Sequence, residues 1–206
     1  MNELQQTDEW IAARLGKVTA SRIADMLATT KTGWGASRKN LMAELISERG
    51  TGTQYPHYVS PEMKRGIDMQ PMAVAEYEKR AKILVGPIGF VPHPRIAMAG
   101  CSPDGLVGDD GLVEFKCPNT WTHIEMLRTK TIESRYVLQM QFQLACTNRH
   151  FVDFVSYDDR MKSAQQYICI RCPRNDKTIT MIEAETIKFL GEIEQYMDAL
   201  DMEYPG

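Results

Sequence analysis

Two neighbouring stretches decide how this chain is interpreted: Cys101-Ser102-Pro103-Asp104-Gly105-Leu106-Val107 and Leu112-Val113-Glu114-Phe115-Lys116-Cys117-Pro118. Both are short and rich in apolar residues, and Asp109-Asp110-Gly111 between them predicts a hairpin turn. Side chains alternate along a strand, so Glu114 and Lys116 share one face while Val113 and Phe115 share the other. The apolar pair is expected to face the core, and Glu114 and Lys116 are expected to project into a cleft or solvent.

Asp104 lies on the first strand of this hairpin, which brings it near Glu114. The two carboxylates share a face only if the sequence numbers of paired residues have an even sum, such as 106 with 114. That register needs an odd-length loop or a bulge. Adjacent carboxylates repel, and a hard cation such as Mg²⁺ relieves the repulsion while keeping positions for water and phosphate oxygens. With Lys116 alongside, the pattern favours phosphodiester hydrolysis with one or two metal ions.

The Glu-x-Lys pattern alone is weak evidence for this chemistry. On an exposed strand it is an ordinary ion pair that contributes under about 1 kcal/mol. The addition of Pro103-Asp104 on the preceding strand makes the arrangement more specific and raises the nuclease interpretation to an equal footing with that alternative.

The composition is that of one folded domain spanning residues 1–206, with 43% hydrophobic and 25% charged residues. Apolar windows are too short for a membrane helix, and the acidic, polar N-terminus does not resemble a signal peptide. The five cysteines are odd in number, so we expect reduced thiols in a cytoplasm. A net charge of −3 argues against non-specific coating of nucleic acid and decides little else.

The period of the apolar residues changes along the chain. Helical spacing dominates both ends, and short strand-like runs occupy the middle. This order predicts an α/β fold, a mixed central sheet flanked by helices. Helices are expected at 8–15, 38–49, 61–82, 120–129, 136–146 and 183–202, with a further helix start at 19–21 and a kink at Pro71. Strands are expected at 88–91, 96–99, 106–107, 112–117, 151–157 and 166–172.

Several short pieces occur in a joint order over nearly the whole chain. They are Trp10, Arg14-Leu15-Gly16, Thr19-Ala20-Ser21, Arg65-Gly66, Gln70-Pro71, Tyr77-Glu78, Cys101 to Leu106, Glu114 to Pro118, Tyr136, Gln139-Met140-Gln141 and Tyr157 to Met161. Each piece is weak alone. Together they resemble the PD-(D/E)xK nuclease superfamily and, within it, the phage lambda exonuclease or YqaJ-type viral recombinase family. The resemblance implies a restriction-endonuclease-like core.

The resemblance also implies a role for each matching residue of the catalytic centre. Asp104, Glu114 and the backbone carbonyl of Phe115 would bind Mg²⁺, one or two ions, with Mn²⁺ as a substitute. Lys116 and Gln139 would complete the catalytic set. Gln141 belongs to the same glutamine motif, whereas Gln143 fits the polar, solvated face of an amphipathic helix.

Three further positions match those that hold a 5′-terminal phosphate in the family, namely Arg14, Ser21 and Ser102. Their chemistry is compatible, because Arg offers a two-pronged donor and Ser21 lies near an expected helix N-terminus. Without the resemblance, Arg14 would be interpreted as a solvated helix residue. Ser21 could equally act as a helix cap, a role that does not exclude phosphate binding.

One position departs from the family pattern. Where the family usually has an acidic residue on the long helix, this chain has Gln70. An amide oxygen still ligates but brings no charge, so Gln70 is a weaker candidate ligand and a second metal site should bind less tightly. The sequence leaves three explanations of Gln70 open: natural variation, an alteration that weakens catalysis, or compensation by Glu78 or another acid.

Weaker candidates for DNA contact surround the polar loop 29–37. Trp34 lies there with Lys31 and Arg38 nearby, and aromatic-plus-basic loops suit contact with a nucleic-acid strand. An exposed loop with a partly buried Trp34 explains the same residues. Tyr136 could pack in the core or contact DNA.

The resulting hypothesis is a Mg²⁺-dependent exonuclease that degrades the 5′-ended strand of linear duplex DNA and leaves a 3′ overhang. The resemblance further implies a ring-shaped homotrimer around DNA, a single-strand annealing protein as partner, and a phage or prophage origin in a bacterial cytoplasm. A site-specific restriction-type endonuclease and a non-catalytic scaffold that binds DNA ends are the alternatives. Comparing digestion of linear and circular DNA would distinguish the exonuclease from a restriction-type endonuclease. Metal-dependent release of nucleotides would distinguish it from a non-catalytic scaffold.

Overall fold

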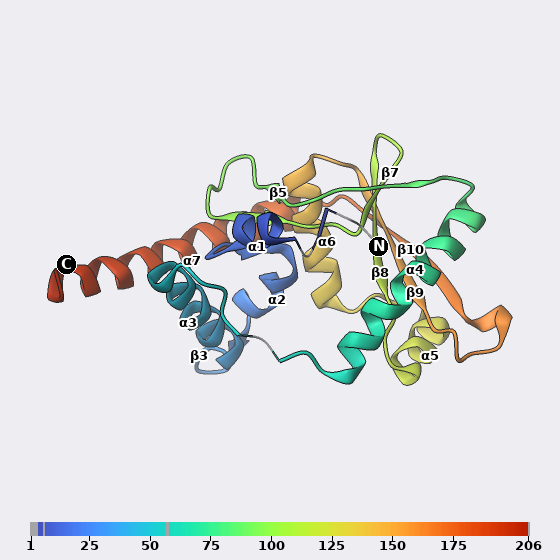
Figure 1. Cartoon of the computed structure of the whole chain (residues 1–206), viewed down its shortest axis with the longest axis horizontal. Coiled ribbons are helices and arrows are strands. Elements are labelled where there is room, and N and C mark those ends of the chain that lie inside the picture. Colours follow the sequence, from blue (N-terminus) through green and yellow to red (C-terminus); the bar gives the residue numbers. More distant parts are fainter. Residues whose placement is uncertain (1–3, 6, 57, 206) are drawn as a thin grey trace.

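A five-stranded sheet lies in one half of the molecule, on the right in Figure 1. The computed structural model describes residues 4–5, 7–56 and 58–205. β8 (Gly111–Lys116) pairs parallel with β9 (Phe151–Tyr157) and antiparallel with β7 (Gly105–Val107). β10 (Tyr167–Pro173) and β4 (Val85–Gly86) form the two edges, each paired antiparallel with its neighbour. The predicted mixed sheet is confirmed.

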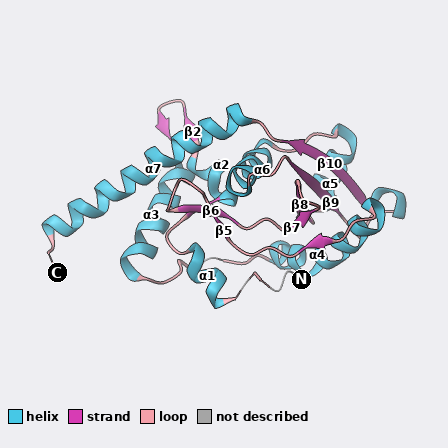
Figure 2. Ribbon diagram, turned by 90° about the horizontal axis from the view of Figure 1, so that it is seen from above, coloured by secondary structure: helices cyan, strands magenta, loops and turns pink. Residues whose placement is uncertain are grey.

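Helices cover both faces of this sheet (Figure 2). α4 (Pro61–Ala81) packs on the face that carries Val113 and Phe115. α6 (Ser134–Thr147) packs on the opposite face, against Leu112 and Phe154. Glu114 shares the α6 face, where only 3% of the residue is exposed. The expectation that this face opens to a cleft or solvent is therefore wrong for Glu114, because a sheet with helices on both sides has two buried faces.

A second layer packs on the other side of α6. Its small sheet joins β1 (Val18–Thr19), β6 (Ala99–Cys101) and β5 (Val91–Pro92), with β1 and β6 parallel. The helical elements of this layer are α1 (Asp8–Arg14), the 3-10 turn Ala20–Arg22, α2 (Ile23–Met26), α3 (Ala36–Thr51) and α7 (Asp176–Glu203). α6 thus serves two cores, and every residue from Gln139 to Cys146 is buried.

The helix starts follow local capping chemistry. Thr7 accepts a hydrogen bond from the Trp10 backbone N–H at 3.1 Å and begins α1. Ser60 accepts one from the Met63 N–H at 3.2 Å, with Pro61 at the first helical position of α4. α4 continues through Pro71 to Ala81.

The short strands near residue 90 differ from the sequence-based expectation. Residues 87–90 and 94–98 are irregular, and the strands lie at β4, β5 and β6 instead. Pro87, Pro92 and Pro94 cannot donate to a ladder, which restricts pairing to two- and three-residue segments. The expected loop 29–37 also contains a small hairpin, β2 (Thr29–Thr30) with β3 (Gly33–Trp34).

α7 begins earlier than expected, at Asp176 rather than Glu183. Asn175 caps it by accepting a hydrogen bond from the Thr178 N–H at 3.0 Å, and buried Ile179 and Ile182 extend the apolar stripe. The C-terminal half of α7 extends beyond the rest of the fold (Figure 1). Within the described ranges, no helix has both the length and the apolar character needed to cross a membrane.

Candidate active site

The β7–β8 hairpin has the register that the two carboxylates require. Gly105 pairs with Val113 and Leu106 with Leu112, so the sums of the paired numbers are even, although 106 pairs with 112 rather than 114. The connection is the three-residue turn at 108–110, one residue earlier than expected, and Gly108 adopts a positive φ of 54° there. Asp104 directly precedes β7, and continuing the same register places it opposite Glu114.

Asp104 lies against the end of β8. Its Oδ2 accepts a hydrogen bond from the Phe115 backbone N–H at 2.7 Å, and the Gln70 side chain also bonds to this carboxylate. Burial and the negative charge of Glu114 raise the pKa of Asp104 to about 7, against the opposing effects of Lys116 and the two hydrogen bonds. The pair therefore carries more negative charge than its surroundings neutralise.

Three donors surround the Glu114 carboxylate. Lys116 Nζ lies 2.6 Å from Oε1, and Gln139 Nε2 donates to the same oxygen at 2.7 Å. Gln143 Nε2 donates to Oε2 at 2.7 Å. The placement of Gln143 on a solvated helix face is wrong, since this residue is 0% exposed. Its spacing of four residues from Gln139 is the sequence signal that could have placed it at the site.

Gln141 points away from the site. Its Nε2 donates to the Pro173 carbonyl at 2.8 Å and its Oε1 accepts from the Asn175 N–H at 2.7 Å. The expectation that it lies beside the active site is wrong, because a residue two positions along a helix faces a different side. Gln141 instead ties α6 to the start of α7.

Lys116 is the one cation within reach of the carboxylate pair in the described contacts. Burial lowers the pKa of Lys116, but the charges of Glu114 and Asp104 raise it by more, so the amine stays protonated. The ammonium also lies 5.1 Å from the centre of the Tyr136 ring, and Arg135 stacks on the same ring at 4.5 Å. Tyr136 thus lies at the site, between Lys116 and the surface.

Asp104, Phe115 and Lys116 open onto a cleft of about 640 Å³ between α4 and the start of α5 (Thr120–Thr129). Its other lining residues come from α4, from the turn after β8, from α5 and from α6: Glu62, Met63, Gly66, Ile67, Gln70, Cys117, Pro118, Asn119, Thr122, Arg135 and Tyr136. Gln70 lies on the α4 wall beside Asp104.

The donor set of this cleft fits a hard divalent cation. The Asp104 carboxylate and the Phe115 carbonyl line the cleft, and the Glu114 carboxylate lies buried next to them. All three supply oxygen, the ligand that Mg²⁺ prefers, and the Gln70 amide, which bonds to Asp104, carries an oxygen as well. Burial, and then the charge of Glu114, raise the pKa of Asp104, and a cation bound to this carboxylate would oppose both effects. In the described ranges, no three His, Cys, Asp or Glu side chains cluster as a metal site, so any ion here would rely on two carboxylates.

Arg14 and Ser102 meet next to this centre. Arg14 Nη1 donates to Ser102 Oγ at 2.9 Å and Trp10 Nε1 donates to the same oxygen at 3.0 Å, while the Arg14 guanidinium stacks 4.1 Å over the Trp10 ring. Burial lowers the pKa of Arg14. Ser102 lies two residues before Asp104, so this contact joins α1 to the catalytic hairpin.

Ser21 and Arg14 line one small cavity of about 90 Å³, with Lys17, Thr19 and Arg22 on its walls. The helix start expected at 19–21 is present, but the helical segment that follows it is short. A three-residue 3-10 turn precedes a four-residue α2, so little helix dipole is available there.

Comparison with known proteins identifies the family of this chain and the fold that it shares. A model of the YqaJ-like viral recombinase domain matches residues 9–150. The chain belongs to that family. It is 51% identical to an alkaline exonuclease from Laribacter hongkongensis (LHK-Exo), with a TM-score of 0.90, covering 96% of this chain and 97% of that one. The same enzyme in complex with dAMP matches equally well. No curated protein sequence matched.

A phage related exonuclease from Haemophilus somnus 129PT has the same fold. Its TM-score is 0.74 at 10% identity, with 89% of this chain and 96% of that chain covered. This member of the YqaJ-like family is thus an exonuclease homologue over nearly its whole length, and the expected restriction-endonuclease-like α/β core agrees with these structures.

Arg38 does not take the DNA-contacting position expected from the sequence. It is 1% exposed, its guanidinium bonds to Glu192 and to the Met26 carbonyl, and it lies between the rings of Trp34 and Phe189. Because Trp34 packs on Arg38, it fastens the β2–β3 hairpin to the body while remaining 43% exposed. Lys31 is exposed in this hairpin, and its contact with DNA stays a prediction.

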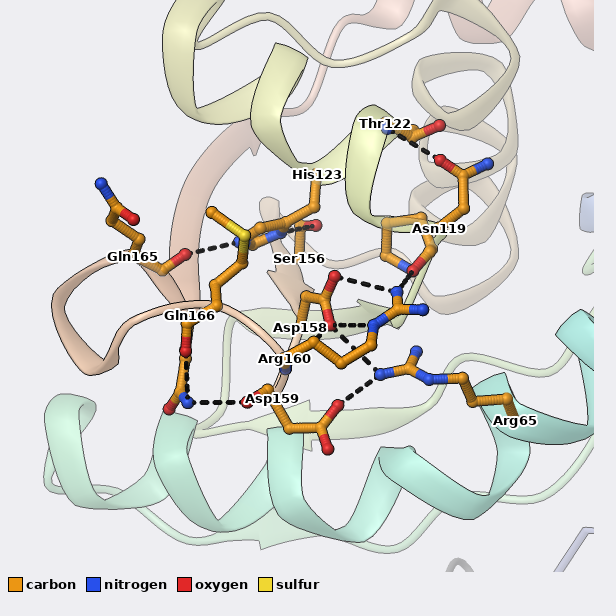
Figure 3. A network of polar contacts seen from close by, with 12 residues as sticks. Arg65, Asn119, Thr122, His123, Ser156, Asp158, Asp159, Arg160, Gln165 and Gln166 are labelled. Carbon is orange, nitrogen blue, oxygen red and sulfur yellow. Dashed lines mark hydrogen bonds and ion pairs between the residues drawn. The ribbon is translucent and has the colours of Figure 1, made fainter.

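A charged network supports the end of β8 in this YqaJ-like protein (Figure 3). Asp158, at the end of β9, is 0% exposed and accepts hydrogen bonds from Arg160 and Arg65. Arg65, on α4, also bonds to Asp159, and Arg160 reaches the Pro118 carbonyl at 3.3 Å. These bonds connect α4, β9 and the turn after Lys116, so they fix the two walls of the cleft.

Proposed function

We propose that this protein is a divalent-metal-dependent exodeoxyribonuclease that hydrolyses the 5′-ended strand of linear duplex DNA and leaves a 3′ overhang. The observation that carries the proposal is the pair Asp104 and Glu114, with Lys116 bonded to Glu114 and with Asp104 and Lys116 open to the cleft. The identity to an alkaline exonuclease over nearly the whole chain supports the same reaction class.

The carboxylates of Asp104 and Glu114 would hold the cation, with the Phe115 carbonyl and Gln70 as further ligands. A bound Mg²⁺ or Mn²⁺ supplies Lewis acidity toward a phosphate oxygen and a more acidic water. Gln139 and Lys116 keep Glu114 Oε1 in place through their hydrogen bonds. Asp104 is held by the Phe115 N–H, so both acids are oriented before substrate arrives.

Lys116 is protonated and positioned to stabilise charge. In hydrolysis a water oxygen forms a bond to phosphorus while the bond from phosphorus to the 3′ oxygen breaks, and negative charge develops on the phosphoryl oxygens. A fixed ammonium beside that phosphate lowers the barrier because it needs no reorganisation. The leaving 3′ oxygen takes up a proton, and the remaining strand keeps a new 5′-phosphate.

The Arg14–Ser102–Ser21 region would select the 5′ end. Ser102 Oγ already accepts from Arg14 and Trp10, so its own O–H is available to donate to a phosphate oxygen. A terminal phosphate carries nearly two charges near pH 7, more than a diester, and a guanidinium favours it accordingly. The related enzyme's complex with dAMP, a nucleotide that carries one such phosphate, supports a product of that kind.

Family membership supports three features beyond the reaction. The match to a YqaJ-like viral recombinase domain supports a role in phage recombination and a phage-encoded origin in a bacterial host. A single-strand annealing protein as partner is proposed from the family resemblance alone. A homotrimeric ring around DNA follows from the same resemblance. Size-exclusion chromatography with light scattering would test the ring. A trimer would have a mass of about three times 23.4 kDa.

The direct test is release of nucleotides from linear duplex DNA. The proposal predicts acid-soluble nucleotides with Mg²⁺, none with EDTA, and none from covalently closed circular DNA. Cleavage of the circle at fixed sites would support a restriction-type endonuclease instead. Binding of DNA ends without metal-dependent release would support a scaffold.

A further inference from the structure

Three glutamines occupy alternate positions on α6, and two of them face the same carboxylate. Gln139 and Gln143 are four residues apart, so they stack on one face of the helix. Gln139 bonds to Glu114 Oε1 and Gln143 bonds to Glu114 Oε2, each at 2.7 Å. Gln141, between them, bonds to Pro173 and Asn175 instead. Side chains of α6 therefore donate hydrogen bonds to both carboxylate oxygens of Glu114.

The hydrogen bonds at the two oxygens of Glu114 are unequal. Oε1 has Lys116 and Gln139 as donors, whereas Gln143 is the donor to Oε2. A carboxylate held at one oxygen can rotate about its terminal carbon–carbon bond, and a second donor at the other oxygen stops that rotation. An amide does this without adding positive charge, so the negative charge that a cation requires is retained.

The surroundings of Gln143 are unfavourable for a polar side chain that has only a packing role. It is 0% exposed, and its Oε1 has no hydrogen-bond partner within the part of the chain that the structure describes. Turning the amide over would place that acceptor against the Glu114 carboxylate, which is repulsive. Leu144 and Met140 show that this helix accepts apolar side chains at neighbouring buried positions. An unpaired buried acceptor costs free energy, so the donor must compensate.

We propose that Gln143 is a positioning residue that fixes the Glu114 carboxylate for binding of the divalent cation. This inference rests on the proposed function, because it assigns the Glu114 carboxylate to a metal. Residues behind metal ligands typically change metal affinity about 10–100-fold when removed. Gln143 is expected to act in that range, through Glu114 and without touching the substrate.

The test compares Gln143→Met with Gln141→Met. Both substitutions remove a buried amide from α6 and keep the side-chain length. Mn²⁺ binding to the DNA-free protein is measured by titration calorimetry, together with the Mn²⁺ concentration for half-maximal digestion and the unfolding temperature in EDTA. Gln143→Met should weaken Mn²⁺ binding about tenfold and raise the half-maximal concentration in parallel. Gln141→Met should lower the unfolding temperature and leave Mn²⁺ binding unchanged.

Equal Mn²⁺ affinity of Gln143→Met and the unmodified protein would overturn the inference, while the proposed nuclease function would stand. If the unmodified protein itself neither binds Mn²⁺ nor releases nucleotides, the proposed function fails and this inference falls with it. Gln143→Asn serves as the second variant if Gln143→Met does not fold. It keeps the amide but is too short to reach Glu114, so the same loss of affinity is expected, and wild-type affinity would count against the proposal.

Discussion

Asp158 directly follows β9 and Asp104 directly precedes β7, the two strands that flank β8, yet their surroundings differ in charge. Asp158 accepts hydrogen bonds from Arg160 and Arg65. Burial raises its pKa, but the hydrogen bonds from Arg160 and Thr120 and the charge of Arg160 outweigh that effect and lower the pKa to about 2. Asp104 faces Glu114 and shares a single lysine with it, and its pKa rises to about 7. The first carboxylate is neutralised by the protein. The second shares Lys116 with another acid, so the pair is only partly neutralised, which favours binding of a cation.

This contrast distinguishes residues that stabilise the walls of the cleft from residues that are proposed to bind metal and catalyse the reaction. Arg65, Asp158 and Arg160 join α4 to the turn after β8 and satisfy one another (Figure 3). Asp104, Glu114 and Lys116 carry one net negative charge by formal count, two acids against one base. Substitutions in the first group should therefore affect stability, and substitutions in the second should affect catalysis and metal binding.

The largest effect is expected at Lys116. Lys116→Ala removes the fixed ammonium beside the developing phosphoryl charge, and we expect the rate of nucleotide release to drop at least about 100-fold. Binding of linear DNA ends, measured by gel shift in Ca²⁺, should persist. Loss of end binding together with unchanged turnover of bound DNA would contradict the assigned role.

The end-selecting pocket should give the next largest effect. Linear duplex DNA with 5′-phosphates should be digested about 10–100-fold faster than the same DNA with 5′-hydroxyls, since a charge-assisted contact contributes about 1.5–3 kcal/mol. Arg14→Ala should remove most of this difference and slow 5′-hydroxyl DNA much less. Equal single-turnover rates on both substrates with the unmodified protein would disprove the phosphate pocket.

At Asp158 we expect loss of stability with metal binding retained. Asp158→Asn removes the buried carboxylate that Arg65 and Arg160 share, and the loss of such a charged hydrogen-bond partner costs about 1.5–3 kcal/mol in the free energy of unfolding. The folded pKa lies below the ordinary value of 3.8, so this stabilisation is present above about pH 4 and is lost as the pH falls toward 2. Urea unfolding at pH 7 and pH 3 should show a smaller difference between wild type and variant at pH 3.

The smallest effect is expected at Gln70. Gln70→Glu adds a carboxylate beside Asp104, so a second ion should bind more tightly. The Mg²⁺ concentration for half-maximal rate is expected to fall a few-fold. This change corresponds to about 1 kcal/mol of additional binding free energy. An unchanged or higher requirement would mean that Gln70 is no ligand or that another acid already compensates.

The hairpin and the acids on its two strands could be predicted from the sequence, because alternation along a strand is a local rule. The even register was only the condition for the acids to share a face, and the structure meets it with a different pairing, Leu106 with Leu112. The sequence also placed the caps at Thr7 and Ser60. The predictions for Gln143 and Arg38 were wrong, because both side chains were expected at the surface and both are buried. Their burial depends on how α6 and α3 pack on distant elements, and neither spacing nor residue type reveals such long-range contacts. The strands near residue 90 were misplaced for a related reason, since their pairing is limited by prolines and by partners distant in sequence.

Calorimetric titration of Mn²⁺ into the DNA-free protein tests the central comparison most directly, with Asp104→Asn and Asp158→Asn measured beside the unmodified chain. The account predicts that Asp158→Asn binds Mn²⁺ as the unmodified protein does and that Asp104→Asn shows no measurable binding. Binding of equal strength by Asp104→Asn, or its loss in folded Asp158→Asn alone, would contradict the account.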